Sequence, residues 1–136
     1  GAIARAAEWL AETLERGGDA LLVGAGTSGR LAVLEAAECP PTFGTEPERI
    51  RAAIAGDAEA VFAAREGAED REDDGSAAAS TLAAGDLLVG VSASSVTAFV
   101  RGALATARAR GARTVLLTCA SADAGTACLC ATRPLR

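Results

Sequence analysis

The chain has 136 residues, a net charge of −5, 50% hydrophobic residues and 3% aromatic residues, so one domain can bury a core built from Ala, Val, Leu and Ile. All 13 cationic residues are arginines spread along the chain, and His and Lys are absent, which excludes His-based catalysis and a lysine Schiff base and argues against a nucleic-acid surface. No stretch is long enough for a membrane span and no signal peptide is visible, so no membrane partner is expected.

Apolar runs that fit buried strands alternate with segments of helical periodicity along the chain. This alternation predicts an α/β fold with a doubly wound parallel sheet, in a single domain over residues 1–136. The expected elements are a helix over 2–16, a strand over 20–23, a glycine-rich turn over 24–29, a helix over 30–38 closed by two prolines, a strand or helix over 49–55, a helix over 57–68, a loop over 69–75, a helix over about 76–84, a strand over 87–91, a turn over 92–95, a helix over 97–110, a strand over 114–119 and an extended piece over 128–132.

The four cysteines form no CxxC pair, and three of them have apolar neighbours. Cysteine packs well as a small hydrophobic residue, so we expect buried free thiols in a reducing cytoplasm and no disulfide scaffold. The residues are Cys39, Cys119, Cys128 and Cys130.

The turn Gly24-Ala25-Gly26-Thr27-Ser28-Gly29 matches the G-x-G-x-x-G pattern between a strand and a helix. A dinucleotide site also needs an acidic residue at the end of the next strand, about twenty residues on, and here that distance falls just after a double proline. An anion cradle remains, in which the NH groups of a helix start and the hydroxyls of Thr27 and Ser28 bind a phosphate. The alternative is that these hydroxyls only cap the helix.

A second hydroxyl-rich turn follows the strand that ends at Val91, with Ser92, Ser94, Ser95 and Thr97. In an open parallel sheet, two turns at carboxyl ends of strands can face one crevice. We therefore predict that the two turns together bind a sugar phosphate.

Longer blocks of sequence resemble the N-acetylmuramic acid 6-phosphate etherases, which have a sugar-isomerase (SIS) phosphosugar-binding domain of three-layer, flavodoxin-like architecture. The resemblance covers nearly the whole chain. The matching blocks are Gly24-Ala25-Gly26-Thr27-Ser28-Gly29-Arg30-Leu31, Ala37-Glu38-Cys39-Pro40-Pro41-Thr42-Phe43-Gly44, Ile54-Ala55-Gly56 and Glu66-Gly67-Ala68-Glu69-Asp70.

The resemblance implies a lyase of cell-wall sugar recycling, which releases D-lactate and N-acetylglucosamine 6-phosphate without metal or organic cofactor. A base takes the C2 proton of the open-chain sugar, lactate leaves C3, and water adds back. By the resemblance, Glu38 matches the proton donor and Glu69 the second catalytic glutamate, as the C2 base. Gly26, Thr27, Ser28, Gly29, Ser94, Ser95 and Thr97 would bind the substrate.

The superfamily commonly places its sugar site at a homodimer interface, and the alanine-rich first helix offers an apolar stripe for that contact or for packing on its own sheet. The second turn departs from the family, since Ser95, Val96 and Ala98 replace a glycine, an arginine and a proline. Etherases also continue past the position of Arg136. The alternative function is therefore a regulatory phosphosugar-binding domain without catalysis, with a phosphosugar isomerase as a third candidate.

Overall fold

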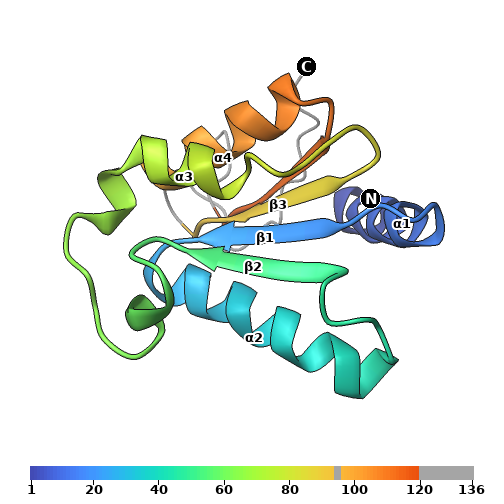
Figure 1. Cartoon of the computed structure of the whole chain (residues 1–136), viewed down its shortest axis with the longest axis horizontal. Helices are drawn as coiled ribbons and strands as arrows, with labels where there is room; N and C mark the ends of the chain where they lie inside the picture. Colours follow the sequence, from blue (N-terminus) through green and yellow to red (C-terminus); the bar gives the residue numbers. More distant parts are fainter. Residues whose placement is uncertain (94–95, 120–136) are drawn as a thin grey trace.

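The described part of the chain folds into a four-stranded parallel sheet between two layers of helices (Figure 1). The computed structural model describes residues 1–93 and 96–119. The strand order is β2-β1-β3-β4, which confirms the predicted doubly wound sheet. The elements are α1 (Ala2–Glu15), β1 (Ala20–Gly24), α2 (Gly26–Phe43), β2 (Ile50–Ile54), the 3-10 turns η1 (Ala58–Val61) and η2 (Ala68–Asp70), α3 (Glu72–Ala78), β3 (Leu87–Val91), α4 (Ala98–Ala109) and β4 (Arg113–Leu117).

Alternate residues of the strands feed two separate cores, because successive side chains point to opposite faces of a sheet. Ala20 and Leu87 face α1 and α2, whereas Leu21 and Leu88 face α3 and α4. The apolar stripe of α1 packs on this chain's own sheet through Ala6, Trp9, Leu10 and Leu14. The α1 stripe is therefore used within the chain.

Two predicted element boundaries were wrong around α2. The helix begins at Gly26, inside the glycine-rich turn, and continues through Pro40 and Pro41 to Phe43. The prolines remove the NH groups that would donate to the carbonyls of Ala36 and Ala37, so the last turn of the helix lacks two of its hydrogen bonds. Gly44, in the left-handed conformation, closes the helix by donating its NH to the carbonyl of Pro40 at 2.9 Å.

The predicted helix over 57–68 is wrong, since only the short 3-10 turn η1 and Ala68, the first residue of η2, are helical there. The carbonyls of Ala60 and Val61 would accept from residues 64 and 65 in an α-helix, but they accept from the Arg30 side chain instead. The predicted loop over 69–75 and helix over 76–84 are also displaced. The helix α3 starts at Glu72, since its three acidic first-turn residues suit a helix amino end.

The ambiguous segment over 49–55 forms β2. Of the strands predicted at 20–23, 87–91 and 114–119, β3 has the predicted bounds, and the bounds of β1 and β4 differ by one or two residues. The helix predicted over 97–110 is α4, and α3 packs closely on it. A Cβ at Gly75 or Gly102 would collide with the backbone of the facing helix. The predicted extended piece over 128–132 lies outside the described residues.

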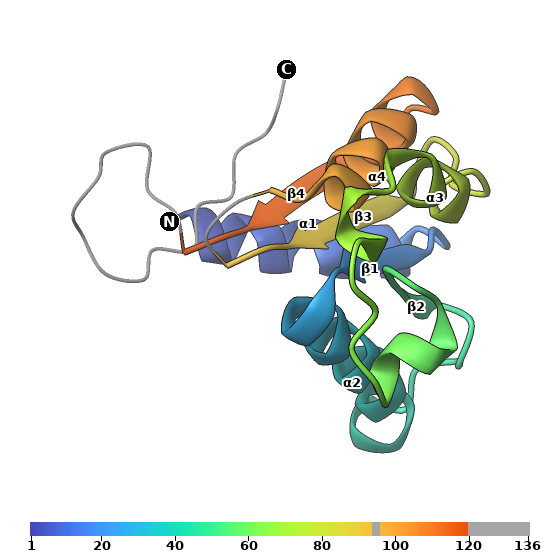
Figure 2. The same cartoon turned by 90° about the vertical axis from the view of Figure 1, so that its left-hand side faces the viewer.

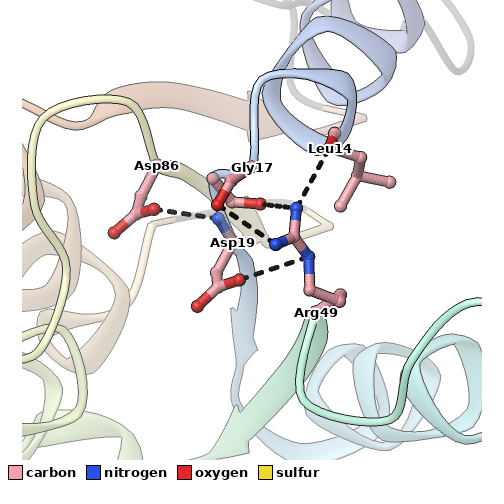
Figure 3. Close-up of polar contacts among 6 residues, drawn as sticks. Leu14, Gly17, Asp19, Arg49 and Asp86 are labelled. Atoms are coloured by element: carbon pink, nitrogen blue, oxygen red, sulfur yellow. Dashed lines mark hydrogen bonds and ion pairs between the residues drawn. The ribbon is translucent and has the colours of Figure 1, made fainter.

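At the amino ends of the strands, Arg49 joins three segments of the chain (Figure 3). Its guanidinium donates to the carbonyls of Leu14, Gly17 and Gly18 at 3.0, 3.1 and 2.6 Å. Its Nε lies 3.5 Å from Oδ1 of Asp19. The start of β2 is thereby attached to the turn between α1 and β1.

We expect Arg49→Gln to lower the free energy of unfolding by about 2 kcal/mol, since hydrogen bonds from a charged donor to partly buried carbonyls are lost. Urea unfolding followed by circular dichroism measures the change. Arg5→Gln, at an exposed position of α1, is the matched control and should unfold like the wild type. Equal midpoints for the two variants would contradict the role given to Arg49.

Candidate functional site

The glycine-rich turn and the turn after β3 lie at the same edge of the sheet on neighbouring strands. Gly24 at the end of β1 pairs in register with Val91 at the end of β3. The strand order reverses at this point, because β2 lies on the other side of β1. Open α/β sheets bind ligands in the crevice at such a switch point.

The first turn is held by a backbone contact that only glycine permits. A Cβ on Gly24 would lie 2.7 Å from the amide nitrogen of Gly29, and a Cβ on Gly29 would lie 2.5 Å from Cγ1 of Ile54. The start of α2 is thereby pressed against the end of β1. Gly26 has a φ of 55°, which favours glycine at that position as well.

The amino end of α2 is open for an anion. Its N-cap residue is Ala25, no side chain caps it, and its first turn contains no acidic residue. Thr27 is exposed and Ser28 is half-buried. The NH groups of the first helical residues lack partners within the helix, and their dipoles favour a negative charge. The alternative that Thr27 and Ser28 cap α2 is therefore wrong, because no side chain caps this helix.

The second turn is only partly described, since Ser94 and Ser95 lie outside the described residues. Ser92 is buried, with 5% of its surface exposed. Thr97 is the N-cap of α4, and its hydroxyl accepts from the NH of Val100 at 3.4 Å. One of the four hydroxyl residues of this turn thus has an ordinary capping role.

The two candidate glutamates lie at different ends of the sheet. Glu69 is half-buried in η2, next to the buried Ala68. This turn lies where the loop after β2 reaches the helices of the other face, at the carboxyl edge (Figure 2). Glu38 is exposed on α2, twelve residues after Gly26. At 1.5 Å per residue it lies about 18 Å along the helix from the glycine turn.

That distance exceeds the reach of an open-chain hexose phosphate. Within one chain, a sugar phosphate bound at the glycine turn therefore cannot meet Glu38. The continuous helix from Gly26 to Phe43 causes the separation, and the sequence did not reveal it because the two prolines predicted an early end.

The described cysteines and potential metal ligands bear on whether this domain has a thiol nucleophile or a metal site. Partial burial raises the pKa of the Cys39 thiol, and Glu35 adds to the effect, so this neighbour of Glu38 is a poor nucleophile. Cys119 is exposed, contrary to the expected burial, and Cys128 and Cys130 lie outside the described residues. Over residues 1–93 and 96–119, no cluster of three or more potential ligands could hold a metal ion.

One residue that the sequence did not single out also belongs to this edge. Arg30, in the second turn of α2, donates through Nε to the carbonyl of Val61 at 3.0 Å and through Nη2 to that of Ala60 at 2.9 Å. The NH of Ala55 also donates to the carbonyl of Gly24 at 3.0 Å. The loop after β2 is thus attached to both the strand end and the helix.

Pockets alone do not locate the site. A pocket of about 360 Å³ at the opposite edge is lined by Glu12, Asp86 and Arg113, among others. Arg113 donates to Glu12 at 2.8 Å, which holds the pKa of that carboxyl below its usual value. A pocket of about 370 Å³ lies under the loop after β2, lined by residues from Gly56 to Asp74.

The parallel sheet with a glycine-rich turn at its switch point defines a SIS-type α/β domain. Residues 2–108 match the family described as the glucokinase regulatory protein N-terminal SIS domain, and the chain belongs to this family.

Curated relatives extend the comparison. The N-acetylmuramic acid 6-phosphate etherase of Trichormus variabilis is 49% identical over 123 residues, covering 89% of this chain and 40% of the relative. That of Gloeobacter violaceus is 49% identical over 120 residues, covering 87% and 39%. The chain thus spans about two fifths of the length of these relatives.

Among solved structures, the phosphoheptose isomerase GmhA of Neisseria gonorrhoeae is similar with a TM-score of 0.55 and 26% identity. The match covers 86% of this chain and 61% of that one. Over the described residues, no helix combines the length and apolar character needed to cross a membrane.

We expect Gly29→Ala to destabilise the fold by about 2–4 kcal/mol, because the added methyl group meets backbone atoms that cannot move independently. Thermal unfolding measures the loss. Gly1→Ala, where a Cβ would have no neighbour within 4 Å, is the control. A Gly29→Ala variant that melts like the wild type would mean that β1 and α2 are not in this close contact.

Proposed function

We propose that this chain carries the sugar-phosphate site of an N-acetylmuramic acid 6-phosphate etherase, which yields N-acetylglucosamine 6-phosphate and D-lactate. The uncapped amino end of α2 at the switch point of the sheet is the observation that carries the proposal. The etherase relatives, 46–49% identical over most of the chain, support it. We also propose that residues 1–136 form one domain and that the protein acts in the cytoplasm on sugars recycled from the cell wall.

In this proposal, the phosphate binds the NH groups and hydroxyls of residues 26–29 and the hydroxyls of Ser94, Ser95 and Thr97. Glu69 removes the C2 proton of the open-chain sugar, which is acidified by the C1 aldehyde. Glu38 protonates the lactate oxygen as the bond to C3 breaks, and water then adds to the unsaturated aldehyde. General acid and base groups typically contribute about 10²–10⁴-fold to such steps.

Glu69→Gln should abolish both lactate release and exchange of the C2 proton with deuterium, because proton abstraction comes first. Glu38→Gln should block lactate release and retain exchange. Enzymatic D-lactate detection and proton NMR in deuterium oxide measure the two steps. Loss of exchange only in Glu38→Gln would reverse the roles, and full activity in both variants would contradict the proposed site.

We further propose that the protein is a homodimer in which Glu38 serves the site of the other copy. One face of α2 carries four residues at spacings of four, three and four, namely Thr27, Leu31, Leu34 and Glu38. All four are exposed, and both leucines have 53% of their surface exposed. This face points away from the sheet, on which Ala32 and Ala36 pack.

Antiparallel packing of two copies of α2 covers these leucines. With the two-fold axis midway between Leu31 and Leu34, each Glu38 lies opposite Thr27 of the other copy, because the spacing is symmetric about that point. The acid is then beside the glycine turn that it cannot reach within its own chain. A second copy therefore satisfies two features at once, the exposed leucines and the separated glutamates.

Co-expression of Glu38→Gln with Glu69→Gln tests the shared site. Random pairing makes half of the dimers mixed, and each mixed dimer has one site with both glutamates intact, so about a quarter of wild-type lactate release should return. Each variant alone, purified in parallel, is the control and should stay inactive. No recovery would mean that both glutamates act within one chain, whereas a wild type without lactate release would contradict the etherase proposal itself.

The second candidate is a regulatory phosphosugar-binding domain without catalysis. The family match to a regulatory protein's SIS domain favours it, as do the changes at Ser95, Val96 and Ala98. Calorimetric titration with N-acetylmuramic acid 6-phosphate separates the two candidates. Binding without lactate release supports the regulatory domain.

A further inference from the structure

The loop after β2 crosses the carboxyl edge of the sheet (Figure 2). It begins at Ala55, which is buried and bonded to Gly24, and it ends at Ala68, which is packed in the core with Phe99 of α4. Between them, residues 62–67 are all exposed, and Phe62 has 91% of its surface exposed. Ala68 alone separates this exposed span from Glu69.

Arg30 supplies the attachment of this loop to α2. Its two hydrogen bonds reach adjacent carbonyls, those of Ala60 and Val61, at the end of η1. A planar guanidinium donates to two neighbouring acceptors at fixed geometry, which a lysine ammonium does not reproduce. Within the loop, Arg65 also pairs with Glu59, but this ion pair joins loop to loop and is well exposed.

We propose that Arg30 is a positioning residue for Glu69, an inference that rests on the proposed etherase function. Arg30 lies one turn after the NH groups of α2 that would hold the phosphate, and it fixes η1 to that same helix. The position of the loop that leads to Glu69 is therefore set relative to the bound sugar. The geometry assigns to this arginine the alignment of the base with C2.

The main rival role is direct binding of the phosphate by the Arg30 charge. The two roles predict different kinetics, since a positioning residue acts on the chemical step and a phosphate ligand acts on binding. Both Nε and Nη2 are occupied by loop carbonyls, which favours the positioning role.

Arg30→Gln should lower kcat for lactate release by about 10²-fold, because small misplacement of a catalytic group costs that much. C2 deuterium exchange should fall with it, and KM and the dissociation constant of inorganic phosphate should change little. Arg30→Lys keeps the positive charge but loses the planar pair of donors, so its kcat should stay below that of the wild type. Arg49→Gln, which removes a similar carbonyl-binding guanidinium from the opposite edge, should keep the wild-type kcat.

A raised KM with unchanged kcat in Arg30→Gln would overturn the proposal in favour of a phosphate ligand, as would full recovery in Arg30→Lys. Hydrogen exchange by mass spectrometry gives a readout that does not need activity. Amides of residues 58–70 should exchange faster in Arg30→Gln than in the wild type or Arg49→Gln, and equal rates would overturn the proposal. A wild type that releases no lactate contradicts the proposed function, and the exchange rates then still decide whether Arg30 holds the loop.

Discussion

The arrangement of this domain depends on the contact between Gly24 and Gly29, where a strand end and a helix start meet with no room for a side chain. Because α2 begins against the end of β1, its free NH groups face the crevice at the switch point. The same contact fixes the direction of the helix, which then runs back over β1 and β2 toward the other edge of the sheet (Figure 1). Where an anion could bind and where Glu38 lies both follow from this one close approach.

Arginine side chains bind backbone carbonyls of segments that lie outside the sheet. Arg49 binds carbonyls at the amino edge, Arg30 does so at the carboxyl edge, and Arg110 donates to the carbonyl of Leu82 at 2.5 Å behind α3. In each case a guanidinium bonds to backbone that lies outside helices and strands or at their ends. A chain with no lysine and no histidine can use its cations in this way because arginine combines several donors with a long apolar stem.

The sequence predicted those parts of the fold whose signals are local. Apolar runs identified β1, β3 and β4, and the glycine pattern identified the junction where β1 leads into α2. The helix predicted over 57–68 was wrong because its local pattern does not reveal a distant partner. The Arg30 side chain donates to two carbonyls that would otherwise accept hydrogen bonds within that helix. The helix end predicted from the two prolines was also wrong, because α2 continues through them and is closed by the left-handed Gly44. The resemblance supplied both glutamates, but their separation appears only once the length of α2 is known.

Glu38 lies inside α2, five residues before the helix ends at Phe43. The helix dipole acts mainly on the first and last turns, so it does little for a carboxylate at this position within one chain. In the proposed antiparallel pair, Glu38 lies beside the uncapped amino end of the other helix, where the dipole favours a negative charge. The same pairing covers Leu31 and Leu34, so one arrangement accounts for both the exposed leucines and the distance between the two glutamates.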